Sequence, residues 1–453
     1  MRLNIYIRTL GCDKNTVDSE CVAGLLEESG HTITGDPDAA DVILVNTCGF
    51  IRDAKQESVD AILDFAVGKR SEQRLIVTGC LSQRYGDELS DLIPEAEYFL
   101  GVNDYRMLPT LIEASPQGQR VFAGPYEPNG SKEFHGWDDS IGPRSSGAGA
   151  LIHTAPIKIA EGCSNACSYC SIPAIRGPYR SRPAESILQE AGRLAGRGCK
   201  ELVLVAQDVA AYGQDLRGTG HLVRLLQALV KIEGIEWVRL MYCYEEGITD
   251  ELIDTIRTEP KICKYIDIPL QHSCDSILQR MNRLSTRASI KSTINKLRKQ
   301  IPDIAIRTTL IVGFPGETEE EFDDVKSFVE SMKFERLGVF AYSQEEGTPA
   351  ALMAPQIPEA EKERRRDEIM QLQCAISLEH NRRRIGQTIR VLVDEVNEGG
   401  TYTGRTMQDA PDIDNGVLFA SEDDFSPGEF ACVTVEDAFD YDLAGTGRKE
   451  VRP

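Results

Sequence analysis

Residues 159–177 read IAEGCSNACSYCSIPAIRG, and Cys163, Cys167 and Cys170 lie within this short stretch. A structural zinc site takes four ligands in a closed tetrahedron, usually from two C-x-x-C pairs. Only one close group of cysteines is present here, and no paired Cys or His follows at the expected distance. Three thiolates on one loop can instead hold three irons of a 4Fe-4S cluster, which leaves the fourth iron without a protein ligand. The spacing therefore predicts a reactive cluster rather than a structural metal site.

The residues around this loop predict strands that alternate with helices. Six strand candidates lie between about 151 and 384: APIKIAEG, KELVLVAQD, WVRLMYCY, YIDIPLQ, IAIRTTLIVGF and RLGVFAYS. A closed barrel of this kind needs eight strand–helix units, so six units predict an open, partial TIM-type (β/α)6 barrel. The three cysteines would then follow its first strand, at the rim where barrel active sites lie. Residues 359–384 are expected to form a long connecting helix at the end of this domain.

The rest of the chain predicts two further folded parts and a linker. In residues 1–114, the runs NIYIRTL, DVILVNT and RLIVTG alternate with amphipathic stretches, which is typical of an α/β domain with a parallel sheet. Residues 115–150 are rich in Gly, Pro and Ser without periodicity and are expected to be a linker. From 386 to 453, short strands joined by turn residues indicate a small antiparallel β-barrel. The fold class is therefore multidomain α/β.

A second group of cysteines is spread over the N-terminal domain, with one directly after each predicted strand: Cys12, Cys48 and Cys80. The carboxyl ends of parallel strands share one edge of a sheet, where ligands collect. Any one of these cysteines alone would more often be a small buried hydrophobe. Each one also stands beside a glycine, which allows the backbone to approach a bulky inorganic core. The repeated position favours a second cluster, and the other seven cysteines are expected to be packing residues.

Composition places the chain among soluble proteins. Of its 453 residues, 41% are hydrophobic and 27% are charged, and no stretch approaches the roughly 18 apolar residues that span a bilayer. The start, MRLNIYIRTLGC, has the pattern of a first strand rather than of a signal peptide. Thirteen cysteines without a leader argue for reduced thiols. We therefore expect a cytoplasmic protein without membrane attachment.

The charge of the C-terminal block bears on the choice of partner. Residues 386–453 hold 15 acidic and 5 basic residues, in a chain whose formal net charge is -22. Barrels that bind RNA need a positive groove for phosphate. This block is expected to repel RNA and to attract a strongly basic protein. The alternative is that its acidity only keeps the protein soluble or reflects a salty habitat.

The motifs together resemble the radical S-adenosylmethionine methylthiotransferase family over nearly the whole chain. IAEGCSNACSYCSIPAIRG matches the radical signature of that family, while TLGCDKNTVDSE, VNTCGFI and TGCLSQRY are similar to its three N-terminal ligand motifs. The final block is similar to the family's TRAM domain, an OB-like barrel. IRGPYRSRP, GVFAYSQEEGTPA and APDIDNGVLF resemble the RimO branch, which modifies an aspartate of small-subunit ribosomal protein twelve. Asp13 and Thr16 depart from the family's usual Pro and aliphatic residue, and neither departure removes a ligand.

This resemblance implies two 4Fe-4S clusters, held by the two cysteine groups, and two S-adenosylmethionine molecules per turnover. An unactivated C–H bond cannot be broken by a positioned base, so a radical is needed. By analogy with the family, the barrel cluster reduces S-adenosylmethionine to release a 5′-deoxyadenosyl radical. The N-terminal cluster then hands over a sulfur that is already methylated. The product would carry a methylthio group on the β-carbon of the aspartate. A flavodoxin-type or ferredoxin-type electron donor and a basic ribosomal protein would be the partners.

Three further residues are candidates for contact with S-adenosylmethionine. Tyr169 lies between two ligands and could pack near the adenine, although ordinary core packing is an alternative. Gln207 and Gly313 each end a barrel strand at the active rim, where a purely structural turn role is the alternative. His272 also follows a strand, but a lone histidine there is more often simply hydrogen-bonded.

Two other functions compete with this one. The first is a tRNA methylthiotransferase that acts on isopentenyladenosine or threonylcarbamoyladenosine, with the same clusters and a nucleoside target. The acidity of residues 386–453 makes tRNA the less favoured partner. The second is a non-catalytic iron–sulfur protein, which would not cleave S-adenosylmethionine.

Overall fold

The structure is a computed structural model that describes residues 2–114, 118, 120–122, 144–145 and 153–450. The N-terminal unit is a parallel sheet in the order β2-β1-β3-β4-β5-β6. Its strands are β1 (Asn4–Thr9), β2 (Thr32–Ile33), β3 (Val42–Thr47), β4 (Arg74–Gly79), β5 (Tyr98–Leu100) and β6 (Arg120–Phe122). Its helices are α1 (Asp13–Glu28), α2 (Arg52–Gly68), α3 (Cys80–Leu92) and α4 (Leu108–Glu113), and the short 3-10 helix η1 (Tyr105–Met107) precedes α4. The predicted parallel α/β unit is confirmed.

The expected linker, 115–150, lies largely outside the described residues. Its residues Arg120–Phe122 form β6, which pairs in parallel with β5. The sheet therefore extends beyond residue 114, where the sequence pattern placed the end of the first domain. The three-residue strand is too short for its periodicity to be read from the sequence.

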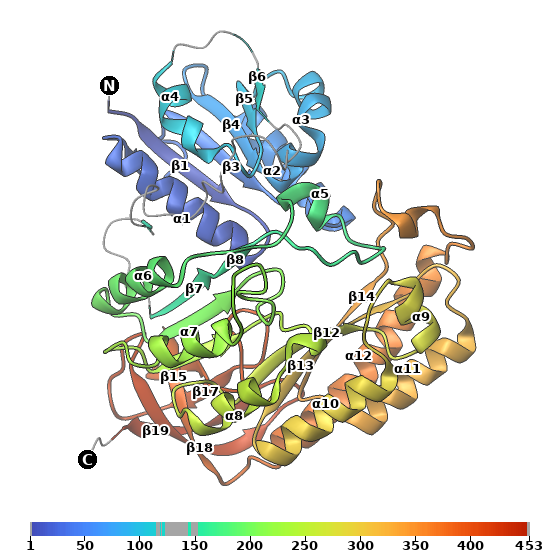
Figure 1. Ribbon diagram of the computed structural model, residues 1–453. Helices are drawn as coiled ribbons and strands as arrows, with labels where there is room; N and C mark the ends of the chain where they lie inside the picture. Colours follow the sequence, from blue (N-terminus) through green and yellow to red (C-terminus); the bar gives the residue numbers. More distant parts are fainter. Residues whose placement is uncertain (1, 115–117, 119, 123–143, 146–152, 451–453) are drawn as a thin grey trace.

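The central unit is the predicted partial barrel of six parallel strands (Figure 1). Two three-stranded sheets, β11-β10-β7 and β12-β13-β14, are linked by a parallel bridge between Val238 and Ile262. The strands are β7 (Thr154–Lys158), β10 (Glu201–Val205), β11 (Trp237–Leu240), β12 (Tyr265–Gln271), β13 (Ala305–Val312) and β14 (Arg336–Ala341). A short antiparallel pair, β8 (Ala160–Glu161) and β9 (Arg180–Ser181), follows β7.

Helices follow the barrel strands, and most of them cover the outer face of the barrel, while α5 packs against α3 of the N-terminal unit. They are α5 (Ile172–Arg176), α6 (Ala184–Gly196), α7 (His221–Leu229), α8 (Asp250–Thr258), α9 (Asp275–Arg280), α10 (Arg287–Gln300), α11 (Glu319–Met332) and α12 (Glu359–Arg382), with 3-10 helices η3 (Glu245–Gly247) and η4 (Pro349–Leu352). Helix α12 is the predicted long connecting helix, and it packs against β14 and α11. Among the described residues, no helix is long and apolar enough to cross a membrane.

The C-terminal unit is a closed five-stranded barrel in the order β15-β16-β17-β19-β18. Its strands are β15 (Thr388–Val396), β16 (Thr401–Arg405), β17 (Val417–Ala420), β18 (Phe430–Ala438) and β19 (Leu443–Lys449). All neighbouring pairs are antiparallel except β17 and β19, which run parallel. The expected small barrel is confirmed, and one of its strand pairs, β17 with β19, is parallel.

The C-terminal barrel packs against the central unit through one mixed apolar cluster. Trp237 and Tyr265 of the partial barrel lie in a single core with Leu392 and Phe430 of the C-terminal barrel. The rings of Trp237 and Phe430 meet edge to face, with their centroids 5.1 Å apart. The side of the partial barrel that two missing strand–helix units would close is thus covered by another domain. The N-terminal unit lies at the other side, with α5 and β8 at its boundary (Figure 1).

Candidate active site

The three cysteines of the N-terminal unit lie at one edge of its sheet. Cys12 follows β1, Cys48 follows β3, and Cys80 begins α3 directly after β4. These strands are neighbours, so their carboxyl ends bring the three loops together. A methyl group added to Gly11 would lie 3.1 Å from Sγ of Cys48, and one added to Gly49 would lie 2.8 Å from the backbone of Cys80. The loops pack so closely that only glycine fits at these two positions.

Gly79 sets the direction of the loop that carries Cys80. Its φ is +100°, a backbone conformation that side chains with a Cβ rarely adopt. A Cβ at this position would lie 2.4 Å from Oδ1 of Asn46 and 2.5 Å from the carbonyl oxygen of Thr47. The chain can therefore turn from β4 directly into α3, with Cys80 as the first residue of the helix.

A guanidinium from the central unit contacts this cysteine group. Nη2 of Arg176, which is fully buried on α5, lies 3.3 Å from Sγ of Cys80 and donates to Oδ1 of Asn15 at 2.7 Å. Burial raises the pKa of Cys48 to about 12. Burial also raises the pKa of Cys80, and the charge of Arg176 opposes that rise. The thiols of Cys48 and Cys80 are thus mostly protonated by themselves, and a bound metal favours their ionised form.

Arg176 belongs to a buried ionic network that joins the two units. Asp18, on α1 of the N-terminal unit, accepts from Arg176 at 3.0 Å and from Nζ of Lys158 at 2.6 Å. Glu161 accepts from the same two cations at 3.0 and 2.6 Å. Although burial alone would raise it, these cations hold the pKa of Glu161 well below its usual range. Two buried carboxylates and two buried cations fix the N-terminal unit against β7, β8 and α5.

The cysteines of the central unit lie on a loop between β8 and α5. Its start is tied to Gly177, whose carbonyl accepts from the amide of Cys163 at 3.0 Å. The end of the loop is held by a hydrogen bond within the loop, which the amide of Cys170 donates to the carbonyl of Cys167 at 3.2 Å. Burial raises the pKa of Cys163 to about 11 and that of Cys170 to about 12. The three thiols stand at the carboxyl ends of the barrel strands, where the sequence pattern predicts them.

Neither cysteine group is arranged as a site for one metal ion. Among the described residues, no three His, Cys, Asp or Glu side chains are close enough to bind a single ion together. A four-iron core lies between its thiolates and holds them farther apart than the ligands of one zinc ion. Each group offers three thiols, and thiolates are the ligands that iron–sulfur clusters take.

The weaker candidates occupy different environments. Tyr169 packs with Phe314 in a small apolar cluster beside the cysteine loop, and burial raises its pKa. Gln207 is half-buried at the end of β10, on the rim. Gly313 has a φ of +71°, and a Cβ there would lie 2.4 Å from Cγ of Lys362. The side of Gly313 on which a side chain would stand thus faces α12, which agrees with a structural role in the turn.

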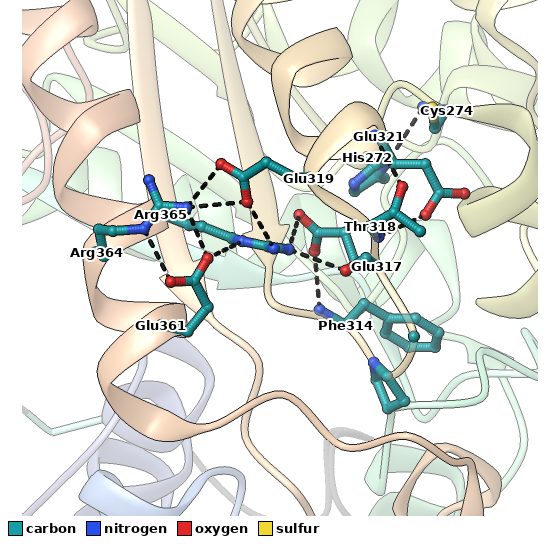
Figure 2. A network of polar contacts seen from close by, with 12 residues as sticks. His272, Cys274, Phe314, Glu317, Thr318, Glu319, Glu321, Glu361, Arg364 and Arg365 are labelled. Carbon is teal, nitrogen blue, oxygen red and sulfur yellow. Dashed lines mark hydrogen bonds and ion pairs between the residues drawn. The ribbon is translucent and has the colours of Figure 1, made fainter.

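Figure 2 shows the polar contacts at the end of β13. The amide of Phe314 donates to Glu317 at 3.0 Å, and Arg365 on α12 pairs with the same carboxylate at 3.1 Å. Burial raises the pKa of Glu317 to about 6. His272 lies close by and accepts from the amide of Cys274 at 3.0 Å, and its burial lowers its pKa to about 3. His272 is therefore the hydrogen-bonded structural histidine that the sequence favours.

A second ionic contact joins the N-terminal and central units near the loop that follows Cys48. Glu345, after β14, accepts from Lys55 at 2.7 Å and from Arg84 at 2.9 Å. Arg84 also donates to the carbonyl of Gly49 at 2.7 Å. This contact ties the loop after Cys48 and helix α3 to the barrel rim.

Sequence reasoning missed three cations at the site. Arg176 follows the cysteine loop within the quoted motif, and Lys14 follows Cys12 by two residues, so proximity was the only available signal. Arg283 is not close in sequence to any of the cysteine motifs. Its guanidinium lies 4.0 Å from the centre of the Tyr244 ring, and its Nη2 donates to the carbonyl of Pro269 at 3.1 Å. Its Nε and Nη1 are buried without a hydrogen-bond partner among the described residues.

Family models match all three units. Residues 4–101 match Uncharacterized protein family UPF0004, residues 157–329 match the Radical SAM superfamily, and residues 385–447 match the TRAM domain. The chain is also similar to a solved structure of the radical S-adenosylmethionine methyltransferase TsrM from Kitasatospora setae. That likeness has a TM-score of 0.58 at 15% identity and covers 89% of this chain and 81% of that chain. At this identity it supports the fold alone.

Curated relatives match along nearly the full length. The proteins named Ribosomal protein uS12 methylthiotransferase RimO from Thermoanaerobacter sp. (strain X514) and Clostridioides difficile (strain 630) are 44% and 46% identical to this chain. The two alignments cover 98% of this chain and 99% and 98% of the relatives. The protein of the same name from Geobacter sulfurreducens is 47% identical over 96% of this chain and 97% of its own length.

Proposed function

This chain belongs to the RimO family of radical S-adenosylmethionine methylthiotransferases, and from this premise we propose that it places a methylthio group on an aspartate of ribosomal protein uS12. The reacting carbon is the β-carbon of that aspartate. The observation that carries the proposal is the gathering of two cysteine groups at one domain junction, where Arg176 contacts Cys80 from the helix after the barrel cysteines. Two S-adenosylmethionine molecules are used per turnover, one for the methyl group and one for the radical.

A radical S-adenosylmethionine enzyme carries a 4Fe-4S cluster and binds S-adenosylmethionine. In this proposal, Cys163, Cys167 and Cys170 hold that cluster, and a second one is held by three residues of the N-terminal unit: Cys12, Cys48 and Cys80. When bound, these groups supply a carbon-centred radical and a methylated sulfur, which no side chain can provide. The chain itself orients the reactants and excludes water from the junction.

The binding residues for S-adenosylmethionine lie near the barrel cysteines. We assign its carboxylate to Arg283, because two nitrogens of this buried guanidinium have no other partner among the described residues. Tyr169 is assigned to the adenine side, where its ring shields the cysteine loop. Gln207 and Gly313 contribute at the rim through a side chain and a turn respectively.

The acidic C-terminal barrel supports a basic protein partner. Its 15 acidic residues against 5 basic ones between 386 and 453 oppose RNA phosphate and favour a ribosomal protein rich in Lys and Arg. The proposal includes a cytoplasmic location, where ribosomal proteins occur, and an electron donor of the flavodoxin or ferredoxin type.

The proposal is tested with anaerobically reconstituted protein. Two clusters predict about eight iron and eight sulfide atoms per chain, and one cluster predicts about four of each. The protein is then incubated with dithionite, S-adenosylmethionine and either uS12 or tRNA, and both products are examined by mass spectrometry. We expect a methylthio group on an aspartate of uS12. Modification of tRNA alone would favour the competing tRNA enzyme, and absence of 5′-deoxyadenosine would favour a non-catalytic protein.

A further inference from the structure

Lys14 is a buried cation that has no carboxylate partner in the described part of the chain. The residue is 6% exposed, and its ammonium lies 3.6 Å from the centre of the Tyr242 ring. It donates one long hydrogen bond, of 3.4 Å, to the carbonyl of Ala206. Among the described residues, no carboxylate oxygen comes within 4.0 Å of this nitrogen. An ammonium that is removed from water in this way still has donors available for an anion.

This ammonium stands where the two units face each other. Lys14 lies in the first turn of α1, two residues after Cys12, while Ala206 and Tyr242 follow the barrel strands β10 and β11. Tyr242 has a φ of 54°, in the left-handed region that residues other than glycine rarely occupy. The amide of Tyr242 donates to Asp267 at 3.0 Å, which holds this conformation and keeps the ring beneath the ammonium. Backbone strain of this kind is typical of binding and catalytic sites.

A cavity lies between the C-terminal barrel and Asp13, the first residue of α1. It has a volume of about 430 Å³ and is lined by Asp13, by Val203 of β10 and by residues of the C-terminal barrel that include Asp412 and Asn415. Nδ2 of Asn415 is buried and has no hydrogen-bond partner among the described residues. The cavity therefore reaches the residue before Lys14 and presents an unsatisfied amide.

Two carboxylates have to be bound in the proposed reaction, and Arg283 and Lys14 are two buried cations for which the described residues provide no ion pair. Arg283 stands near Tyr169 and Tyr244, on the side of the barrel cysteines, and it suits the carboxylate of S-adenosylmethionine. Lys14 stands beside Cys12, on the side from which sulfur would be delivered. Lys14 is thus placed for the carboxylate that does not belong to S-adenosylmethionine.

On the basis of the proposed function, we propose that Lys14 binds the side-chain carboxylate of the target aspartate. The reacting β-carbon is bonded directly to that carboxylate. An ion pair with Lys14 would therefore fix the direction of the C–H bond and make the site selective for an aspartate. Of the two competing nucleosides, isopentenyladenosine has no carboxylate, and the carboxylate of threonylcarbamoyladenosine is on its threonyl group, not on the adenine carbon that would react. Lys14 would then be a residue that determines substrate specificity.

The test combines a change in the enzyme with a change in the substrate. Binding of uS12, and of uS12 with the target aspartate changed to asparagine, is measured anaerobically for the reconstituted wild type and for Lys14→Gln. We expect the wild type to prefer the aspartate form by about tenfold or more, as for a buried charge pair. Lys14→Gln should lose this preference and bind both forms alike, while Lys14→Arg should retain part of it.

Lys69→Gln is the matched control. Its ammonium also contacts a backbone carbonyl, that of Gln73 at 3.1 Å, but at the opposite edge of the same sheet. This variant should keep the full preference for aspartate. Iron content and reductive cleavage of S-adenosylmethionine without uS12 are measured in Lys14→Gln as well.

The possible failures are distinct. A Lys14→Gln protein that still prefers aspartate overturns the inference. Loss of iron in that variant would assign Lys14 to the cluster, and loss of S-adenosylmethionine cleavage would assign it to that cofactor, so either result also overturns it. If wild-type protein does not modify uS12 at all, the proposed function fails and the inference fails with it.

Discussion

Gly79 is the residue at which the geometry of the cysteine edge is most constrained. Its positive φ and the two oxygens near its missing side chain leave no room for a Cβ. Gly79→Ala should shift Cys80 and lower the iron content of reconstituted protein toward one cluster, that is from about eight to about four atoms. Gly68→Ala, at the end of α2 with no atom within 4 Å of its added Cβ, is the control and should keep all the iron. Full iron in Gly79→Ala would refute this role.

His272 makes the stability of the fold depend on pH in a way that the sequence alone does not show. Burial lowers its pKa from 6.5 to about 3, so the folded protein keeps it neutral while the unfolded chain binds a proton below pH 6.5. The stability contributed by the neutral form is complete above pH 6.5 and is lost as the pH falls toward 3. Between pH 7 and pH 5.5 this loss amounts to about 1.3 kcal/mol.

The measurement for His272 is urea unfolding at the two pH values. His272→Gln retains a hydrogen-bond acceptor for the amide of Cys274 and cannot titrate. Its unfolding free energy should change less between pH 7 and pH 5.5 than that of the wild type, by about 1.3 kcal/mol. Equal changes in the two proteins would contradict the assignment.

At the scale of elements, α12 fastens the loop between β13 and α11. Arg365 and Glu317, whose side chains are 6% and 0% exposed, form a buried pair. Arg365→Met removes one partner and leaves a buried carboxylate, which should lower the unfolding free energy by about 3–5 kcal/mol. Arg364→Met is the control, because that side chain is 41% exposed and surface pairs contribute about 1 kcal/mol or less. Thermal unfolding of the two variants checks the contrast, and equal melting temperatures would contradict it.

At the scale of the whole molecule, Arg176 joins the two units. Arg176→Gln leaves Asp18 and Glu161 with Lys158 alone and removes the cation beside Cys80. We expect faster amide hydrogen exchange in α1 and α5 and less iron in the N-terminal unit. Arg298→Gln is the control, because Arg298 on α10 pairs with Glu335 inside the central unit. It should disturb α10 and leave α1 protected. Unchanged exchange in α1 of Arg176→Gln would refute the link between the units.

The amino-acid sequence by itself determined the three units and the two cysteine groups. Strand periodicity and the carboxyl-edge rule placed Cys12, Cys48 and Cys80 together, because neighbouring parallel strands must end at a common edge. The quoted motif located the other three thiols on a loop after the first barrel strand. Only the tertiary structure decided which charges meet these thiols. Arg176, Lys14 and Arg283 reach the site through packing between elements distant in sequence. Such long-range contacts leave no periodic signal, and for the same reason only the folded chain shows that the C-terminal barrel covers the open side of the partial barrel.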